Sequence, residues 1–183
     1  MKTLILGASG ATGSLLTEQL LEKGQEIKII VRPTAKIPES WANNGNITIT
    51  KANLAEMGTN EIAKHLSGCG AVAICLGHNM SLKGIYCKPR KLVTDAVKSC
   101  CEAIKINNGE KPVKMVLMNT AGNRNRDLAE PASIGEKILI GLLRVLLPPH
   151  PDNEQAADYL RVNIGQKDKY VEWVVVRPDS LTD

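Results

Sequence analysis

The sequence contains no phenylalanine, and aromatic residues make up only 3% of its 183 residues. Its core must therefore be built from Leu, Ile and Val, which suits the buried strands of a parallel sheet. No run of about twenty apolar residues occurs, which excludes a membrane-spanning helix. Lysine and arginine are scattered, the net charge is only +4, and no basic block carries interleaved aromatics, so nucleic acid is not indicated as a partner.

Cysteine occurs in odd number and without the paired Cys-x-x-Cys spacing of a disulfide framework or a zinc site. The five cysteines are Cys69, Cys75, Cys87, Cys100 and Cys101. We expect reduced, mostly buried thiols and no metal. The amino terminus enters the first apolar run at once and lacks the features of a secretory signal, so a cytoplasmic location is expected. The length predicts one domain over residues 1–183.

Six short apolar runs alternate with stretches of helical periodicity, which is the pattern of repeated β-α-β units. The apolar runs span 3–6, 27–31, 47–50, 71–76, 113–118 and 173–176. The helical stretches span 14–23, 60–66, 90–106, 133–147 and 153–162. Right-handed crossovers then predict an α/β fold with a doubly wound parallel (Rossmann) sheet in the order 3-2-1-4-5-6. Its ligand crevice lies beyond the carboxyl ends of strands one and four.

Three glycines, spaced three residues apart, stand between the first apolar run and the first helical stretch. Gly7 permits a tight turn, Gly10 lets the backbone approach a pyrophosphate, and Gly13 allows the helix to pack closely on the strand. The amides of the helix start then face an anion, supported by the helix dipole. We predict a dinucleotide-phosphate site, although a plain strand-to-helix connection also uses such turns. The predicted cofactor contacts are Gly7, Ser9, Gly10, Ala11, Thr12 and Gly13.

The residue that follows the second strand indicates which nicotinamide cofactor binds. In dinucleotide-binding sheets an acidic side chain here accepts hydrogen bonds from the free ribose 2′-hydroxyl. This chain has Arg32, whose guanidinium suits a 2′-phosphate. We expect NADP(H), with NAD(H) bound more weakly and with help from Thr34 and Lys36; the alternative is a solvated arginine at a strand edge. Asn53 and Leu54, after the third strand, are further predicted contacts, with Asn53 either beside the adenine or in a turn.

Five segments together resemble the atypical short-chain dehydrogenases, most closely the NmrA-like and biliverdin/flavin-reductase-like group. They are residues 7–13, 31–33, 52–54, 76–77 and 173–183, the last ending in Arg-Pro-Asp-Ser-Leu-Thr-Asp. The resemblance spans nearly the whole chain and implies NAD(P) binding on a Rossmann fold, but no particular substrate. It also implies that residues after strands four and five line the nicotinamide half of the cofactor. These are Leu76, Gly77, His78 and Asn79, and Asn119, Thr120 and Ala121.

The chain departs from the family at the catalytic residues. The main branch uses Ser, Tyr and Lys, with Tyr-x-x-x-Lys on the helix before strand six, whereas here Tyr159 is followed four residues later by Asn163. A phenol with a pKa of about 10 is almost entirely neutral at pH 7 unless a cation lies close. Lys167 and Lys169 lie beyond the helix end predicted at Gly165, so we expect Tyr159 to have a packing role.

Two other residues are predicted to be catalytic. Thr120 stands where the family has its serine, and its hydroxyl can hydrogen-bond a substrate carbonyl or the nicotinamide amide; the alternative is a hydrogen bond at the strand end. His150 lies roughly where the family's tyrosine enters the pocket, and an imidazole transfers protons near neutral pH; the alternative is a histidine in a surface loop. His78 follows strand four at the crevice, where contact with cofactor or substrate is one of two open interpretations.

Two features concern the surroundings of this domain. The chain stops directly after strand six, whereas the family adds elements that form a substrate lid, so a short or absent lid is expected. The stretch 133–147 is the most apolar helix in the sequence, and it carries two adjacent stripes. They are formed by Ile138, Leu142 and Val145 and by Leu139, Leu143 and Leu146. Such a helix is expected to be buried, either in a homodimer or under a further carboxyl-terminal segment.

Three functions are compatible with these expectations. The first is an NADPH-dependent oxidoreductase that reduces a small carbonyl, quinone or flavin-like substrate, because acceptors with their own proton source do not need a tyrosine-lysine pair. The second is a non-catalytic regulator of the NmrA type, in which dinucleotide binding shifts the affinity for a protein partner. The third is a sugar-nucleotide epimerase or dehydratase, which the short chain and the missing lysine disfavour.

Overall fold

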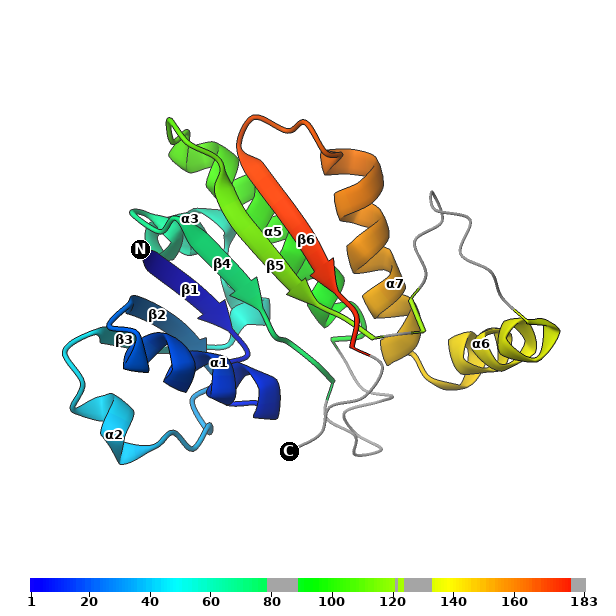
Figure 1. Ribbon diagram of the computed structural model, residues 1–183, viewed down its shortest axis with the longest axis horizontal. Helices are drawn as coiled ribbons and strands as arrows, with labels where there is room; N and C mark the ends of the chain where they lie inside the picture. Colours follow the sequence, from blue (N-terminus) through cyan, green and yellow to red (C-terminus); the bar gives the residue numbers. More distant parts are fainter. Residues whose placement is uncertain (79–88, 121, 124–132, 179–183) are drawn as a thin grey trace.

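The computed structural model describes residues 1–78, 89–120, 122–123 and 133–178, and a parallel sheet forms its centre (Figure 1). The six strands lie in the order β3-β2-β1-β4-β5-β6, which confirms the predicted topology. They are β1 Lys2–Leu6, β2 Glu26–Val31, β3 Ile47–Lys51, β4 Ala71–Ile74, β5 Val113–Met118 and β6 Val171–Val176. The fold is thus an α/β, doubly wound Rossmann domain.

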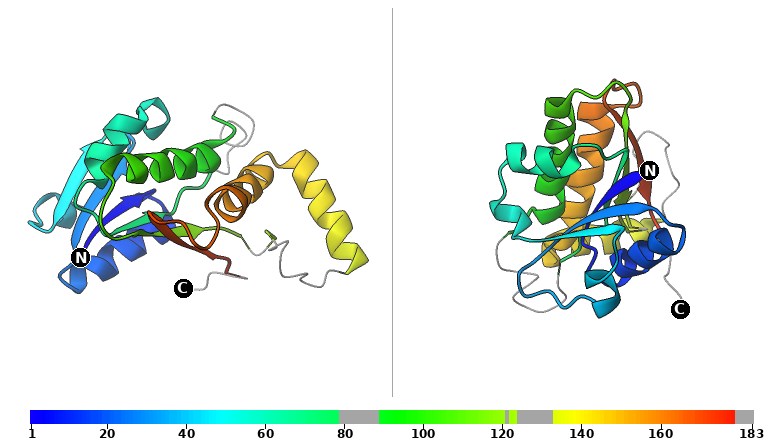
Figure 2. Two further views of the ribbon diagram at one scale, coloured as in Figure 1. Left: turned by 90° about the horizontal axis from the view of Figure 1, so that it is seen from above. Right: turned by 90° about the vertical axis from the view of Figure 1, so that its left-hand side faces the viewer.

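Helices lie on both faces of this sheet, as right-handed crossovers require. One face carries α1 (Ala11–Glu22) and α2 (Glu39–Ala42); the other carries α3 (Thr59–Leu66), α5 (Leu92–Asn107) and α7 (Pro149–Tyr159) (Figure 2). The 3-10 turn η1 (Leu54–Glu56) follows β3, and the π-turn η3 (Leu160–Ile164) extends α7. Each face therefore has its own apolar core. The sequence pattern did not predict α2 or η1.

The helix before β6 begins at Pro149, four residues earlier than predicted. The run Pro-Pro-His-Pro suggests a break, but proline is favoured at the first helical position because its missing N–H has no acceptor there. His150 consequently lies in the first turn of α7 and is largely buried. The alternative interpretation of His150 as a surface-loop residue was therefore wrong.

The helix α6 (Ile134–Leu146) projects away from the sheet beyond the start of α7 (Figures 1 and 2). Its apolar side chains are exposed: Ile138 is 67% and Leu142 is 54% accessible. Within the described residues the expected burial of this helix is thus not found, because apolar periodicity specifies a face to be covered but not what covers it. Among the described residues, no helix is long and apolar enough to span a membrane.

One face of the sheet is uncovered at β5 and β6. Val116, Val174 and Val176 are partly exposed there, and burial alternates along both strands. By contrast, all four residues of β4 are buried. Helices therefore cover both faces of the central strands, as predicted, but only one face of β5 and β6 in the described part of the chain.

The carboxyl ends of β1 and β4 lie side by side at the centre of the sheet. Leu6 is in register with Ile74, and the amide of Cys75 donates to the carbonyl oxygen of Leu6 over 2.8 Å. The strand order reverses between these two strands, which creates the crevice where doubly wound sheets bind their ligands.

Candidate functional site

The turn between β1 and α1 admits only glycine at two of its positions. Gly7 has φ +84°, and a Cβ there would stand 2.4 Å from the carbonyl oxygen of Cys75. A Cβ on Gly13 would stand 2.1 Å from the carbonyl oxygen of Gly7. Both of these Cβ–oxygen distances are far shorter than any contact that a real Cβ atom makes. The turn, the helix start and the end of β4 are therefore packed backbone against backbone.

The amino-terminal end of α1 is left open toward the crevice. Gly10 precedes the helix in an extended conformation. No side chain caps the helix start, and the first turn of α1 holds no acidic residue. Ser9, Gly10 and Ala11 are exposed, and Thr12 is partly exposed. First-turn amides that lack an internal acceptor carry the positive end of the helix dipole. This backbone cradle fits a diphosphate group.

Arg32 is exposed immediately after β2, and it makes no ion pair with the described residues. Its carbonyl oxygen accepts a hydrogen bond from the Ala35 amide, which turns the chain away from the sheet. Val31 is in register with Lys51 of β3, whose side chain is also exposed. The end of β2 thus presents positive charge, and an acidic acceptor for a ribose hydroxyl does not occupy this position.

Asn53 caps the 3-10 turn that follows β3. Its Oδ1 accepts from the Ala55 amide at 3.4 Å, and its Nδ2 donates to Glu56 at 2.6 Å. Leu54 packs against the core beneath α5 and is partly buried. The turn role expected as an alternative for Asn53 is thus present, and the predicted contact with adenine stays a prediction.

Residues after β4 lead from the crevice to a buried contact between a histidine and a carboxylate. Leu76 is partly buried and Gly77 is exposed, whereas Nε2 of His78 lies 2.8 Å from Oδ2 of Asp152. The same carboxylate accepts hydrogen bonds from the amides of Val93 and Thr94, at 2.9 and 3.0 Å. His78 therefore links the crevice to the start of α5. Asn79, also predicted to lie here, is outside the described residues.

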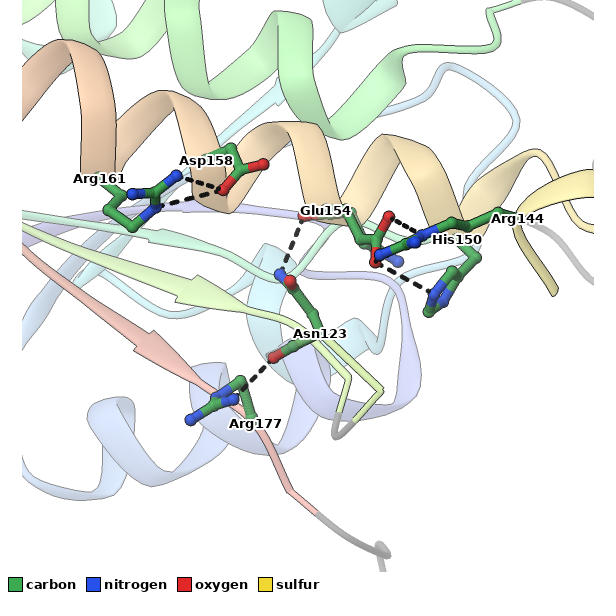
Figure 3. Close-up of polar contacts among 8 residues, drawn as sticks. Asn123, Arg144, His150, Glu154, Asp158, Arg161 and Arg177 are labelled. Carbon is green, nitrogen blue, oxygen red and sulfur yellow. Dashed lines mark hydrogen bonds and ion pairs between the residues drawn. The ribbon is translucent and has the colours of Figure 1, made fainter. Parts of the chain in front are cut away.

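The carboxyl end of β5 runs into a tight turn that presents Thr120. The Asn123 amide donates to the Thr120 carbonyl oxygen at 3.1 Å. Buried Asn119 fixes this turn from inside, since its Oδ1 accepts from the Thr120 amide and its Nδ2 donates to the Asn153 carbonyl oxygen. Arg177, after β6, donates to the Asn123 carbonyl oxygen over 2.7 Å (Figure 3). Ala121 is outside the described residues.

The two predicted catalytic residues both lie near Gly122 of this turn. A Cβ built on Gly122 would lie 3.2 Å from Cε1 of His150 and 4.0 Å from the hydroxyl oxygen of Thr120. Thr120 and His150 are 30 positions apart in sequence, and a Cβ at position 122 would stand close against the imidazole. The geometry therefore places one hydroxyl and one imidazole over the same end of β5.

The imidazole of His150 is buried beside a carboxylate. Its Nε2 has no hydrogen-bond partner, but it stands 3.5 Å from Oε1 of Glu154, one turn along α7. Arg144 of α6 donates to the same carboxylate, from Nε to Oε2 and from Nη2 to Oε1, each over 2.8 Å (Figure 3). This hydrogen bonding raises the pKa of Arg144 above its ordinary value.

Tyr159 is unsuited to proton transfer in this structure. Its ring packs against the core beneath α5, with the Lys98 ammonium 5.6 Å from the ring centroid. Burial raises the pKa of its hydroxyl above the ordinary value, which disfavours the phenolate that the family's mechanism needs. The packing role expected for this residue agrees with its surroundings.

A pocket of about 320 Å³ opens between α7 and the outer edge of β6. It is lined by both apolar and polar side chains, among them Trp173, Asp158 and Arg161. The Trp173 indole donates to the Gly165 carbonyl oxygen at 2.7 Å. Asp158 pairs with Arg161 at 3.2 Å, as Figure 3 shows. This pocket was not anticipated from the sequence, which carries no motif along that edge.

Residues 7–183 match the profile of a protein family described as NAD(P)H-binding. The chain belongs to the NAD(P)H-binding family. The glycine cradle at the start of α1 is where this fold holds the dinucleotide phosphates, so the match and the geometry agree on the class of ligand. The resemblance to NmrA-like and reductase-like proteins inferred from the motifs is confirmed at this level.

Known proteins similar to this family member differ in what they do. An uncharacterised chloroplastic protein of Arabidopsis thaliana is 31% identical over 74 residues, which cover 40% of this chain and 26% of that protein. A UDP-glucuronic acid 4-epimerase of Bacillus cereus, solved with UDP-glucuronic acid and NAD, has a TM-score of 0.68 at 17% identity, over 97% of this chain and 56% of its own. The anaerobilin reductase ChuY of Escherichia coli O157:H7 has a TM-score of 0.64 at 14% identity, over 97% and 72%. At these identities, the two structures show the fold alone.

Two acidic residues of this NAD(P)H-binding protein were missed by the sequence reasoning. Asp152 and Glu154 are both buried on α7, yet neither lies in a segment that the sequence analysis singled out as a motif. For Glu154 a signal existed, because it stands four residues after His150 and so shares its helix face. Asp152 gave none, since its partner His78 lies 74 positions away.

Proposed function

We propose that this protein is an NADPH-dependent oxidoreductase that reduces a small carbonyl, quinone or flavin-like substrate. The observation that carries the proposal is that Thr120 and His150 each have an atom within 4.0 Å of the position that a Cβ on Gly122 would take, near the carboxyl end of β5. This end of the sheet adjoins the crevice where the fold holds its nicotinamide. A hydroxyl and an imidazole there can serve the oxygen of a substrate that accepts a hydride.

The cofactor proposal is NADP(H), with NAD(H) as the weaker ligand. Arg32 supports it, because its exposed guanidinium follows β2, beside the predicted adenosine ribose. A 2′-phosphate contacts such a group through charge-assisted hydrogen bonds, which contribute about 1.5–3 kcal/mol. Gly7, Gly10 and Gly13 would hold the diphosphate through the amides at the start of α1.

The reduction needs one hydride and one proton at the substrate. The nicotinamide, when bound, supplies the hydride. Thr120 donates a hydrogen bond to the substrate oxygen and so favours the negative charge that grows on it. Protonated His150 gives its proton to that oxygen, which completes the alcohol or hydroquinone, and the neutral imidazole is then reprotonated from solvent.

The test is a turnover screen. The purified protein and NADPH are offered quinones, flavins and aldehydes, and loss of absorbance at the nicotinamide band is followed. Saturable oxidation of NADPH by one acceptor class is expected, with a drop of about 10²-fold or more in His150→Gln. The proposal is wrong if tight NADPH binding is measured by calorimetry while no acceptor class is reduced.

That outcome would support the second candidate, a non-catalytic NAD(P) sensor. Two residues favour it. Tyr159, at the end of α7, packs on the core, and Asn163 stands where the family has its lysine. The missing lysine also weighs against an epimerase or dehydratase, because the chemistry of those enzymes employs the tyrosine-lysine pair. A sensor would bind a partner protein with an affinity that depends on the bound dinucleotide.

Two further proposals concern the whole chain. The exposed apolar side chains of α6, such as Ile138 and Leu142, support a homodimer in which this helix is covered. The cytoplasmic location stays a prediction, which microscopy of the tagged full-length protein in its native cells would test.

A further inference from the structure

The carboxylate of Glu154 serves two cations at once. Arg144 of α6 holds it through three N–H···O contacts of 2.8 to 3.2 Å. Its Oε1 also stands 3.5 Å from Nε2 of His150, which has no hydrogen-bond partner of its own (Figure 3). The side chains of Glu154 and His150 are each only 10% exposed. A buried imidazole nitrogen without a partner requires an explanation.

The arrangement is explained if the imidazole acts in its protonated form. A neutral ring with its proton on Nε2 presents only a dipole to the carboxylate, whereas an imidazolium adds the attraction of a full charge at close range. Arg144 is always charged, and it shares the same oxygen atoms. The guanidinium therefore reduces the part of the carboxylate's field that reaches the imidazole.

We propose that Glu154 is a positioning residue for His150, and that Arg144 on α6 limits how strongly it favours the protonated ring. This inference rests on the proposed function, in which His150 is the proton donor. Glu154 then keeps the donor charged and aimed at the turn of Thr120, while the placement of α6 adjusts the pH range over which the donor works.

The groups that face His150 come from three elements. Glu154 lies on α7 itself, Arg144 on α6 stands behind it, and the Thr120–Asn123 turn contributes only neutral groups within the described residues. Asp152, two residues after His150, is engaged with His78 and the start of α5. Within the described residues, the charged groups that face the imidazole are therefore one carboxylate and one guanidinium.

The experiment measures the charge of His150 directly. The protein has three histidines, so proton-carbon spectra of a histidine-labelled sample resolve each ring, and His65 serves as internal reference. In Glu154→Gln the pH at which the His150 signals titrate is expected to fall by about one unit or more. In Arg144→Gln it is expected to rise, because a competing positive charge is gone. Arg144→Lys keeps that charge and should stay near the wild type.

Matched controls remove the same charges elsewhere. Glu26→Gln breaks the exposed pair with Lys2 at the opposite end of the sheet, and Lys105→Gln breaks the pair with Asp168. Neither should move the His150 titration. Opposite shifts in the two test variants support the proposal; shifts in one direction, or none in folded protein, overturn it.

The pH profile of turnover gives a second readout that a purely structural role would not move. Because the protonated imidazole donates, the rate declines as pH rises, and the decline should begin at lower pH in Glu154→Gln and at higher pH in Arg144→Gln. The titration needs no substrate, so it stands even if no acceptor is reduced. Full turnover in His150→Gln would instead refute the assigned donor, whatever the titrations show.

Discussion

At the scale of single residues, the cofactor preference depends on one side chain. Arg32 is exposed at the end of β2 and carries no partner among the described residues, so its charge is available without breaking an existing pair. A carboxylate in the same place would accept hydrogen bonds from a free ribose hydroxyl and repel a phosphate. Exchange of the charge should therefore exchange the preference.

We predict that the wild type binds NADPH about ten- to a hundredfold more tightly than NADH, and that Arg32→Asp removes or reverses this ratio. Calorimetric titration of both proteins with both dinucleotides measures it. Lys64→Asp, an exposed change of equal charge on α3, is the control and should keep the wild-type ratio. Equal affinities in the wild type would contradict the assignment.

At the scale of elements, the start of α5 is capped from another helix. Lys91 precedes α5 without a side-chain cap, and Asp152 of α7 accepts from the amides of Val93 and Thr94 in its place. The carboxylate is fully buried and also meets His78. One side chain therefore satisfies two helix-end donors and fastens α7, α5 and the crevice to each other.

We predict that Asp152→Asn lowers the free energy of unfolding by about 1–3 kcal/mol. The single amide oxygen of asparagine would have to accept what two carboxylate oxygens accept now, and the site is buried. Urea unfolding followed by circular dichroism measures this loss. The control is Asp158→Asn, which removes a partly exposed carboxylate from the same helix and should cost less than about 1 kcal/mol. An equal loss in both variants would argue against the capping role.

The helix α5 buries two adjacent thiols, Cys100 and Cys101. Burial raises the pKa of Cys101 to about 12 from the ordinary 9.0, and it raises that of Cys100 further. The folded state thus keeps these protons at a pH where the unfolded chain loses them. The stabilisation is complete below pH 9 and is lost as the pH rises from there toward the raised values.

We predict that above pH 9 each thiol removes about 1.4 kcal/mol of unfolding free energy per pH unit. Urea midpoints at pH 8, 9 and 10 reveal this slope, and Cys101→Ala should lose the share of one thiol. Cys69→Ala serves as the comparison. Burial also raises the pKa of the Cys69 thiol, but the neighbouring charges of Lys28 and Lys2 lower it, so this substitution should change the slope less. A slope unchanged in Cys101→Ala would contradict the burial argument.

At the scale of the whole molecule, the strand order and the glycine cradle could be predicted because both are written in local sequence. Apolar runs reveal strands, and the tight backbone contacts at Gly7 and Gly13 admit no other residue. The start of α7 was missed because Pro149 acts as a first helical residue here, whereas prolines usually mark a break. The pairs His78–Asp152 and Arg144–Glu154 arise only when separate elements of the chain meet in three dimensions, and a single sequence carries no sign of them.

The helix α6 raises the remaining question at this scale, since its exposed leucines and isoleucines cost free energy in water that a covering surface would recover. Ile138, Leu139 and Leu142 are each more than half exposed, and burying one such side chain contributes about 1.5–3 kcal/mol. We therefore predict a homodimer at micromolar concentration that Leu142→Glu converts to a monomer, as size-exclusion chromatography with light scattering would measure. Val162→Glu places the same charge at another exposed apolar position and should leave the dimer intact, so dissociation in both variants would implicate general repulsion in place of α6. A wild type that is strictly monomeric would remove the dimer altogether, and the apolar stripe would then need a different partner.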